Sequence, residues 1–222
     1  MNLQVIKQQI SAYENQYHRA SGAVLLLAVS KKQSITSIQA AYLAGQRAFG
    51  ENYLQEALEK MVALAHLDIE WHFIGPLQSN KTRKIAEHFS WVQSVDSLRV
   101  AKRLHDQRPP HLPPLNICLE INLNHETSKS GIAPDEVTEL ASDCQSLSRL
   151  KLRGLMTIPA HATSFEDARQ NFQRMHQLFT QLNASGFALD TLSMGMSDDF
   201  EAAIAEGSTL VRIGSAIFGD RS

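Results

Sequence analysis

The sequence is poor in cysteine, carries almost no net charge and has no long hydrophobic run. Its two cysteines, Cys118 and Cys144, lie in segments with the pattern of buried structure, which excludes a disulfide-stapled secreted protein and favours a reducing cytoplasm. A net charge of −2 gives no field that would attract nucleic acid or an acidic membrane. The longest apolar run, Ala23–Val29, is too short to cross a bilayer, and residues 1–20 lack the apolar stretch of a secretory signal.

The composition is that of an ordinary globular protein. Hydrophobic residues make up 43% of the 222 positions and charged residues 20%, which argues against disorder. Four of the seven prolines stand in the segment 109–114, but the same pattern of elements continues on both sides of it. We therefore predict a stiff surface loop there and a single domain over residues 1–222.

Short apolar runs alternate with amphipathic, helically spaced stretches along the whole chain. An additional helix is expected over about Gln4–Arg19, ahead of the first run. The predicted strands are Val24–Val29, Arg47–Phe49, Trp71–Ile74, Trp91–Ser94, Leu115–Ile121, Lys151–Met156, Thr191–Ser193 and Leu210–Ile213.

This alternation predicts an α/β fold with a parallel sheet, because crossover helices make consecutive strands parallel. Eight parallel strands can close on themselves, so we predict a single-domain (β/α)8 TIM barrel. The N-terminal helix would fill the gap left in the outer ring by the absence of a helix after the last strand. An open doubly wound sheet is the alternative, because periodicity does not report closure.

The first strand ends abruptly in two lysines, Lys31 and Lys32. Functional residues of such barrels follow the C-terminal ends of the strands, and a half-buried lysine there has a lowered pKa, as a Schiff-base nucleophile needs. Two solvated lysines that simply end the strand are the other interpretation. Both faces of the run before them are apolar, so the alternation of side chains leaves open which lysine points inward.

The last two strands end in small and hydroxyl-bearing residues. The loops after strands seven and eight are the usual phosphate site of these barrels. Gly214 would let the backbone approach an anion, and the hydroxyls of Ser193 and Ser215 could donate hydrogen bonds to it. Ordinary turn chemistry accounts for glycine and serine there as well. Together with a lysine on the first strand, these residues suit an aldehyde that carries a phosphate.

Two other patterns do not support a site. Residues 75–82 have the spacing of a P-loop, but Asn80 replaces its second glycine and Pro76 removes one of its N–H donors. The nine histidines show no metal-ligand spacing, so no metal site is predicted.

Seven segments, in order along nearly the whole chain, resemble the YggS/PROSC family of pyridoxal phosphate homeostasis proteins. They are Leu27–Lys31, Phe49–Tyr53, Trp71–Lys81, Ser128–Gly131, Leu155–Met156, Ser193–Asp198 and Arg212–Gly219. The resemblance implies a barrel similar to the N-terminal domain of alanine racemase, with pyridoxal 5′-phosphate (PLP) as the cofactor.

The resemblance also implies roles for particular residues. Lys31 would hold PLP as a Schiff base, and Arg212 would face its pyridine nitrogen. The phosphate would be held by Ser193, Gly214, Ser215 and the backbone near Met194, while Asn52 and His72 would lie near the pocket.

Two further lysine positions of the family bear on cofactor exchange. Relatives often carry a second lysine two positions after the Schiff-base lysine, where this chain has Gln33, so an accessory role of that lysine is not carried over. Lys129 matches a further family lysine, which implies a part in cofactor exchange or a second PLP site.

An arginine opposite the ring nitrogen disfavours the pyridinium form and weakens PLP as an electron sink. The resemblance further implies that racemases with this arginine rely on a second domain and on a tyrosine acid/base from a partner subunit. Here all four tyrosines, Tyr13, Tyr17, Tyr42 and Tyr53, stand in the first quarter of the chain, and a missing general catalyst slows proton abstraction by about 10²–10⁴-fold.

The expected function is therefore that of a monomeric cytoplasmic PLP carrier without catalytic residues. It would buffer or deliver the cofactor, through transient contact with apo PLP enzymes, and affect amino- and keto-acid balance indirectly. No nucleic-acid or membrane partner is expected. A low-activity PLP-dependent amino-acid racemase is the alternative, and a Schiff-base aldolase that needs no cofactor is a third hypothesis.

Overall fold

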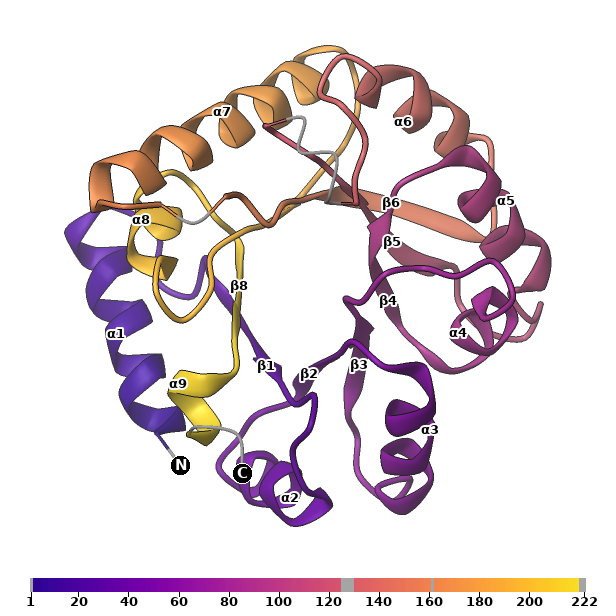
Figure 1. The fold of residues 1–222 in the computed structure, drawn as a ribbon, viewed down its shortest axis with the longest axis horizontal. Coiled ribbons are helices and arrows are strands. Elements are labelled where there is room, and N and C mark those ends of the chain that lie inside the picture. Colours follow the sequence, from indigo (N-terminus) through magenta and orange to yellow (C-terminus); the bar gives the residue numbers. More distant parts are fainter. Residues whose placement is uncertain (1, 125–129, 161, 220–222) are drawn as a thin grey trace.

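The structure, a computed structural model, describes residues 2–124, 130–160 and 162–219, and its strands form a closed barrel (Figure 1). Eight parallel strands follow one another in sequence order, and β8 pairs with β1. The helices form a ring outside the strands (Figure 1). The predicted (β/α)8 barrel with an N-terminal helix is therefore confirmed. The alternative of an open doubly wound sheet is wrong, because the first and last strands of an open sheet do not pair.

The strands form at all eight predicted positions. They are β1 Leu25–Val29, β2 Ala48–Glu51, β3 Glu70–Phe73, β4 Trp91–Val95, β5 Leu115–Glu120, β6 Leu150–Met156, β7 Thr191–Ser193 and β8 Leu210–Ile213. β2 extends two residues beyond the predicted end because Glu51, although charged, is buried. A pattern of apolar residues alone ends that strand at Phe49.

The helices bury their apolar faces against the outer surface of the barrel. They are α1 Leu3–Gln16, α2 Ile35–Leu43, α3 Leu54–Ala63, α4 Thr82–His88, α5 Leu98–Gln107, α6 Val137–Gln145, α7 Phe165–Ala184, α8 Phe200–Ala205 and α9 Ser215–Phe218. Within the described ranges, no helix is long and apolar enough to cross a membrane.

The end of the chain departs from the prediction that no helix follows the last strand. A short helix, α9, follows β8 directly and lies beside α1 (Figure 1). The Asn2 N–H donates a 2.9 Å hydrogen bond to the Ile217 carbonyl oxygen. α1 and α9 therefore share the place in the outer ring that α1 alone was expected to fill. α1 buries Leu3, Ile6 and Ile10 and contacts α8 and α9.

Alternate residues of each strand face the barrel interior. On β1, Leu26 and Ala28 belong to the large core between strands and helices, whereas Leu27 and Val29 belong to a separate cluster inside the barrel. A strand's side chains alternate in direction, so the odd-numbered residues of β1 point inward. Lys31 follows two residues after the strand ends at Val29, at the mouth of the barrel.

Candidate functional site

A cavity of about 250 Å³ lies at the end of the barrel where the strands terminate. Five of the eight predicted site residues line it, namely Lys31, Asn52, Arg212, Gly214 and Ser215. The rest of the lining is Val29, Gln33, Ile74, Ile158, Met196, Ser197, Asp198 and Gly219. These residues come from the ends of six strands, so the closed barrel brings together segments that are far apart in sequence.

Lys31, and not Lys32, reaches this cavity. Lys31 is partly buried and lines it, whereas the Lys32 side chain is exposed. Lys32 adopts a left-handed backbone conformation, with φ of 61°, which costs a non-glycine residue free energy and persists only where the surroundings hold it. The chain therefore turns sharply directly after the candidate Schiff-base lysine.

Charged side chains of α3 and β2 fix the backbone of this turn through hydrogen bonds. Lys60 Nζ donates to the Ser30 carbonyl oxygen at 2.6 Å and to Glu51 Oε1 at 2.7 Å. The Lys32 N–H donates to Glu56 Oε1 at 2.5 Å, and Lys60 Nζ donates to the same oxygen. The backbone is thus fixed on both sides of Lys31.

Sequence reasoning missed this support. Glu56 and Lys60 have the i, i+4 spacing of an ordinary solvent-exposed helix pair, yet Lys60 is only 4% exposed. Burial raises the pKa of Glu51 even though the Lys60 ammonium lies beside it. The only signal in the sequence is a lysine on an otherwise apolar helix face, nine residues after the end of β2.

Arg212 is a buried cation on β8 at the wall of the cavity. Its Nη1 donates to Ser193 Oγ at 2.7 Å and its Nη2 to the Thr157 carbonyl oxygen at 2.8 Å. Burial lowers the pKa of Arg212 to about 10, against the opposing effect of the Asp199 and Glu120 carboxylates. The guanidinium therefore stays protonated at neutral pH and presents a fixed positive charge to the cavity.

The loops after β7 and β8 bring two hydroxyls together. Ser215 Oγ donates to Ser197 Oγ at 3.1 Å, and both residues line the cavity. The β7–α8 loop turns at Gly195, which has φ of +97° and where an added Cβ would lie 2.5 Å from the Ala203 Cβ. Only glycine suits that position. Ser197 lies in the segment that the sequence analysis quoted, but was not singled out as a site residue.

Three predicted site residues lie behind the cavity wall and do not line it. Ser193 is the last residue of β7 and points into the barrel, where it donates to Gln93 Oε1 at 2.6 Å. His72 is fully buried on β3 and stacks on Trp91. Met194 is fully buried in the outer core. Gln33, at the position where the resemblance implies a second lysine, also lines the cavity, and Lys129 lies outside the described residues.

Glu120, at the end of β5, makes the stability of the protein depend on pH. Burial, reinforced by the Asp96 carboxylate, raises the pKa of Glu120 to about 7, whereas the unfolded chain has a glutamate pKa of about 4.3. The folded state therefore binds the Glu120 proton more tightly than the unfolded chain does. This contribution to stability is complete below the unfolded pKa and is lost as the pH rises through about 7.

We expect Glu120→Gln to remove this slope and to raise the free energy of unfolding at pH 8 by roughly 2 kcal/mol. Urea unfolding at pH 5 and pH 8 measures it. The matched control is Glu139→Gln, at an exposed position of α6, which should keep the slope of the unsubstituted protein. Equal slopes in the two variants would contradict the role of Glu120.

Comparison with known proteins gives concordant matches. The family model described as the alanine racemase N-terminal domain matches residues 1–222. The pyridoxal phosphate homeostasis protein of Pseudomonas aeruginosa is 55% identical over 203 residues, which are 91% of this chain and 87% of that protein. The pyridoxal phosphate homeostasis protein of Escherichia coli K12 is 52% identical over 227 residues, 99% of this chain and 95% of that protein.

A solved structure agrees with these matches. PipY of Synechococcus elongatus PCC7942, solved with PLP bound, has a TM-score of 0.84 and 36% identity, and covers 95% of this chain and 100% of its own. The family resemblance found in the sequence is therefore confirmed. This chain belongs to the family of pyridoxal phosphate homeostasis proteins, whose barrel matches the N-terminal domain of alanine racemase.

Proposed function

We propose that this protein binds PLP in the cavity at the C-terminal ends of the strands and holds it through a Schiff base on Lys31 Nζ. The observation that carries the proposal is that one cavity is lined by an amine, a guanidinium and two hydroxyls, those of Lys31, Arg212, Ser197 and Ser215. These groups complement the aldehyde, ring nitrogen and phosphate of PLP. PipY, at 36% identity, has been solved with PLP bound, which supports the same ligand here.

A buried atom in the cavity wall also supports a bound ligand. Asn52 Oδ1 is buried and has no hydrogen-bond partner among the described residues. A buried acceptor without a donor costs free energy, and a ligand that donates a hydrogen bond would remove this cost. The residues present therefore fit PLP.

Each cavity residue has a distinct part in this proposal. Lys31 supplies the amine and Arg212 holds the ring nitrogen. The phosphate is held by the Ser197 and Ser215 hydroxyls and by the turn at Gly214, where the first N–H groups of α9 have no partner within the helix. PLP, when bound, supplies an aldehyde that reacts reversibly with amines.

We further propose that the protein is a PLP carrier that buffers or delivers the cofactor. None of its four tyrosines lines the cavity: Tyr17 hydrogen-bonds to Glu201, Tyr13 packs on Phe200, Tyr42 lies against Arg47, and Tyr53 is exposed. No phenol is therefore positioned to exchange a proton with a ligand in the cavity, and the buried Arg212 cation disfavours protonation of a ring nitrogen beside it. The relatives' name, homeostasis protein, also favours a carrier.

The proposed carrier is a cytoplasmic monomer that contacts apo PLP enzymes transiently. Its two cysteines are free and buried, which suits a reducing compartment. A closed barrel presents no unpaired strand edge to a second copy. A cavity that opens at the barrel mouth allows the cofactor to enter and leave.

The test begins with the visible spectrum of the purified protein, before and after addition of PLP, followed by borohydride reduction and peptide mapping. The proposal expects a yellow protein with a reduced pyridoxyl adduct on Lys31. A protein that stays colourless with added PLP would overturn it. An adduct with a sugar phosphate in place of PLP would support the cofactor-free aldolase.

Assays for turnover then separate the carrier from the racemase. A carrier transfers PLP to an apo PLP enzyme and shows no steady racemisation of any amino acid. Steady turnover that disappears in Lys31→Ala would establish the alternative, a low-activity racemase.

A further inference from the structure

A continuous line of hydrogen bonds through the barrel interior connects Arg212 with the opposite mouth of the barrel. Each contact joins inward-facing residues of β8, β7, β4 and β3. The contacts are Arg212 Nη1 to Ser193 Oγ at 2.7 Å, Ser193 Oγ to Gln93 Oε1 at 2.6 Å, Gln93 Nε2 to His72 Nδ1 at 2.9 Å and His72 Nε2 to Glu70 Oε1 at 2.8 Å. We call these five residues the barrel chain.

The chemistry of its members fixes the direction of the barrel chain. Arg212 can only donate, so the Ser193 oxygen accepts from it, and the Ser193 hydroxyl donates to Gln93 Oε1. The Gln93 amide group then donates to His72 Nδ1, which must be the unprotonated ring nitrogen. His72 therefore carries its proton on Nε2 and donates it to Glu70, so every bond runs from the guanidinium toward the carboxylate.

The middle of the barrel chain is closed to solvent. His72, Gln93 and Ser193 are 0% exposed, and the His72 ring stacks on Trp91 at a centroid distance of 5.1 Å. Burial lowers the pKa of His72, and the hydrogen bond from His72 lowers that of Glu70. A neutral imidazole therefore connects an arginine cation to a carboxylate anion.

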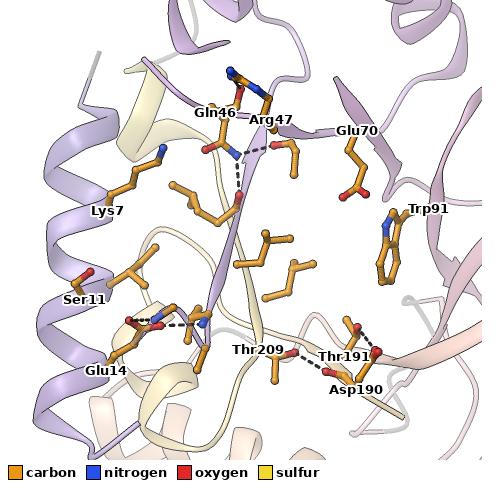
Figure 2. Close-up of a pocket in the computed structure, with 18 of the residues that line it drawn as sticks. Lys7, Ser11, Glu14, Gln46, Arg47, Glu70, Trp91, Asp190, Thr191 and Thr209 are labelled. Carbon is orange, nitrogen blue, oxygen red and sulfur yellow. Dashed lines mark hydrogen bonds between the residues drawn. The ribbon is translucent and has the colours of Figure 1, made fainter. Parts of the chain in front are cut away.

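Glu70 ends the barrel chain in a second cavity, of about 820 Å³, between the barrel floor and α1 (Figure 2). Figure 2 shows its carboxylate beside the Trp91 indole at the edge of this cavity. The packed interior of the barrel separates this second cavity from the cavity that Lys31 and Arg212 line. The barrel chain provides a polar connection between them.

We propose that Gln93, His72 and Glu70 are positioning residues, which fix the Arg212 guanidinium for the ring nitrogen of PLP. The inference rests on the proposed function, since it assigns Arg212 to that nitrogen. Two acceptors, Ser193 Oγ and the Thr157 carbonyl, define the plane of the guanidinium. Gln93 Oε1 accepts the Ser193 hydroxyl proton, so the Ser193 oxygen faces Arg212 as an acceptor. His72 Nδ1 accepts from the Gln93 amide group, which prevents the amide oxygen and nitrogen of Gln93 from exchanging places.

Glu70 sets this whole order because it selects the tautomer of His72. Without an acceptor at Nε2, the imidazole can carry its proton on Nδ1, and Gln93 must then present its oxygen to His72 and its amide group to Ser193. The Ser193 hydroxyl proton would lose its acceptor, and the contact with Arg212 would weaken. A carboxylate at the floor of the barrel thereby orients a cation at the cofactor.

The test compares Glu70→Ala with Glu70→Gln, which keeps an oxygen to accept from His72. We expect Glu70→Ala to weaken PLP binding by about fivefold and Glu70→Gln to stay within about twofold of the unsubstituted protein. The ¹⁵N chemical shift of PLP labelled at its ring nitrogen should move in Glu70→Ala only. Glu139→Ala, an exposed carboxylate on α6, is the control.

A second variant tests the centre of the barrel chain. Gln93→Met keeps the length of the side chain and removes both hydrogen bonds, so PLP binding should weaken by about tenfold. In an Arg212→Met background the same substitution should have no further effect, because the barrel chain acts only through Arg212. Glu70 is half-exposed, so its variants keep the test valid if Gln93→Met does not fold.

The outcomes separate the two proposals. No uptake of PLP by the unsubstituted protein contradicts the proposed function, and with it the role of the barrel chain. Uptake at Lys31 with equal binding and equal ¹⁵N shifts for Glu70→Ala and Glu70→Gln contradicts the positioning role alone. Imidazole ¹⁵N spectra that place the His72 proton on Nδ1 also overturn it.

Discussion

Replacing Lys31 by alanine is expected to abolish the borohydride-stable attachment of PLP and to weaken its binding by roughly 100-fold or more, beyond what a single hydrogen bond contributes. Lys31 is the lysine that lines the cavity of about 250 Å³ with Arg212 and Ser215. Without its amine, the aldehyde of PLP has no partner in the cavity, and only the phosphate and ring contacts hold the cofactor. The visible spectrum and peptide mass mapping after reduction measure the loss.

The adjacent lysine provides the matched control. Lys32 has an exposed side chain that does not line the cavity, so Lys32→Ala should bind PLP as the unsubstituted protein does. Its fold should also be unaffected, since its backbone N–H still donates to Glu56. A reduced adduct that persists in Lys31→Ala and maps to Lys32 would show that the reactive amine has been assigned to the wrong lysine.

Lys60→Met is expected to lower the free energy of unfolding by about 3–5 kcal/mol, because it leaves a buried carboxylate without its cation. Lys60 Nζ lies 2.7 Å from Glu51 Oε1, and the Glu51 side chain is 0% exposed. The variant also loses the hydrogen bond to the Ser30 carbonyl oxygen, which positions the backbone directly before Lys31. We therefore expect slower formation of the Schiff base in addition to lower stability.

Urea unfolding measures the stability change, with two comparisons. The double variant Glu51→Gln/Lys60→Met removes the unpaired charge and should recover much of the loss. Lys84→Met, which breaks the exposed pair of Lys84 with Glu87, should change stability by less than about 1 kcal/mol. Equal effects of the Lys60 and Lys84 substitutions would contradict a structural role for the buried pair.

The sequence by itself determined the parallel α/β arrangement of strands and helices. Eight apolar runs separated by helical spacing predict a parallel α/β fold, because each run must be buried and each crossover is local. Leu27–Lys31 and Arg212–Gly219 identified the family and its cofactor before any geometry was known. Both the strand–helix pattern and the family motifs are properties of short segments, so residues that are neighbours in sequence are enough to specify them.

The tertiary structure decided which side chains meet. Closure of the barrel was invisible to periodicity, and so was the direction of Lys31, because Val24–Val29 is apolar on both faces. The buried pair of Glu51 with Lys60 was not predicted from the sequence at all. Ser193 was predicted to hold a phosphate, but its hydroxyl donates to Gln93 Oε1, and Ser197 is the serine of this segment that lines the cavity.

The physical reason is the same in each case. Burial and hydrogen-bond partners of a polar side chain depend on residues that are distant in sequence: Ser193 and Gln93 are 100 positions apart, and Arg212 and Thr157 are 55 apart. A strand's alternation fixes only which face a side chain takes, and not what lies opposite it. The sequence thus specified the strands and the chemistry that they carry, and only the closed barrel determined which groups reach the cavity and which lie in the chain behind it.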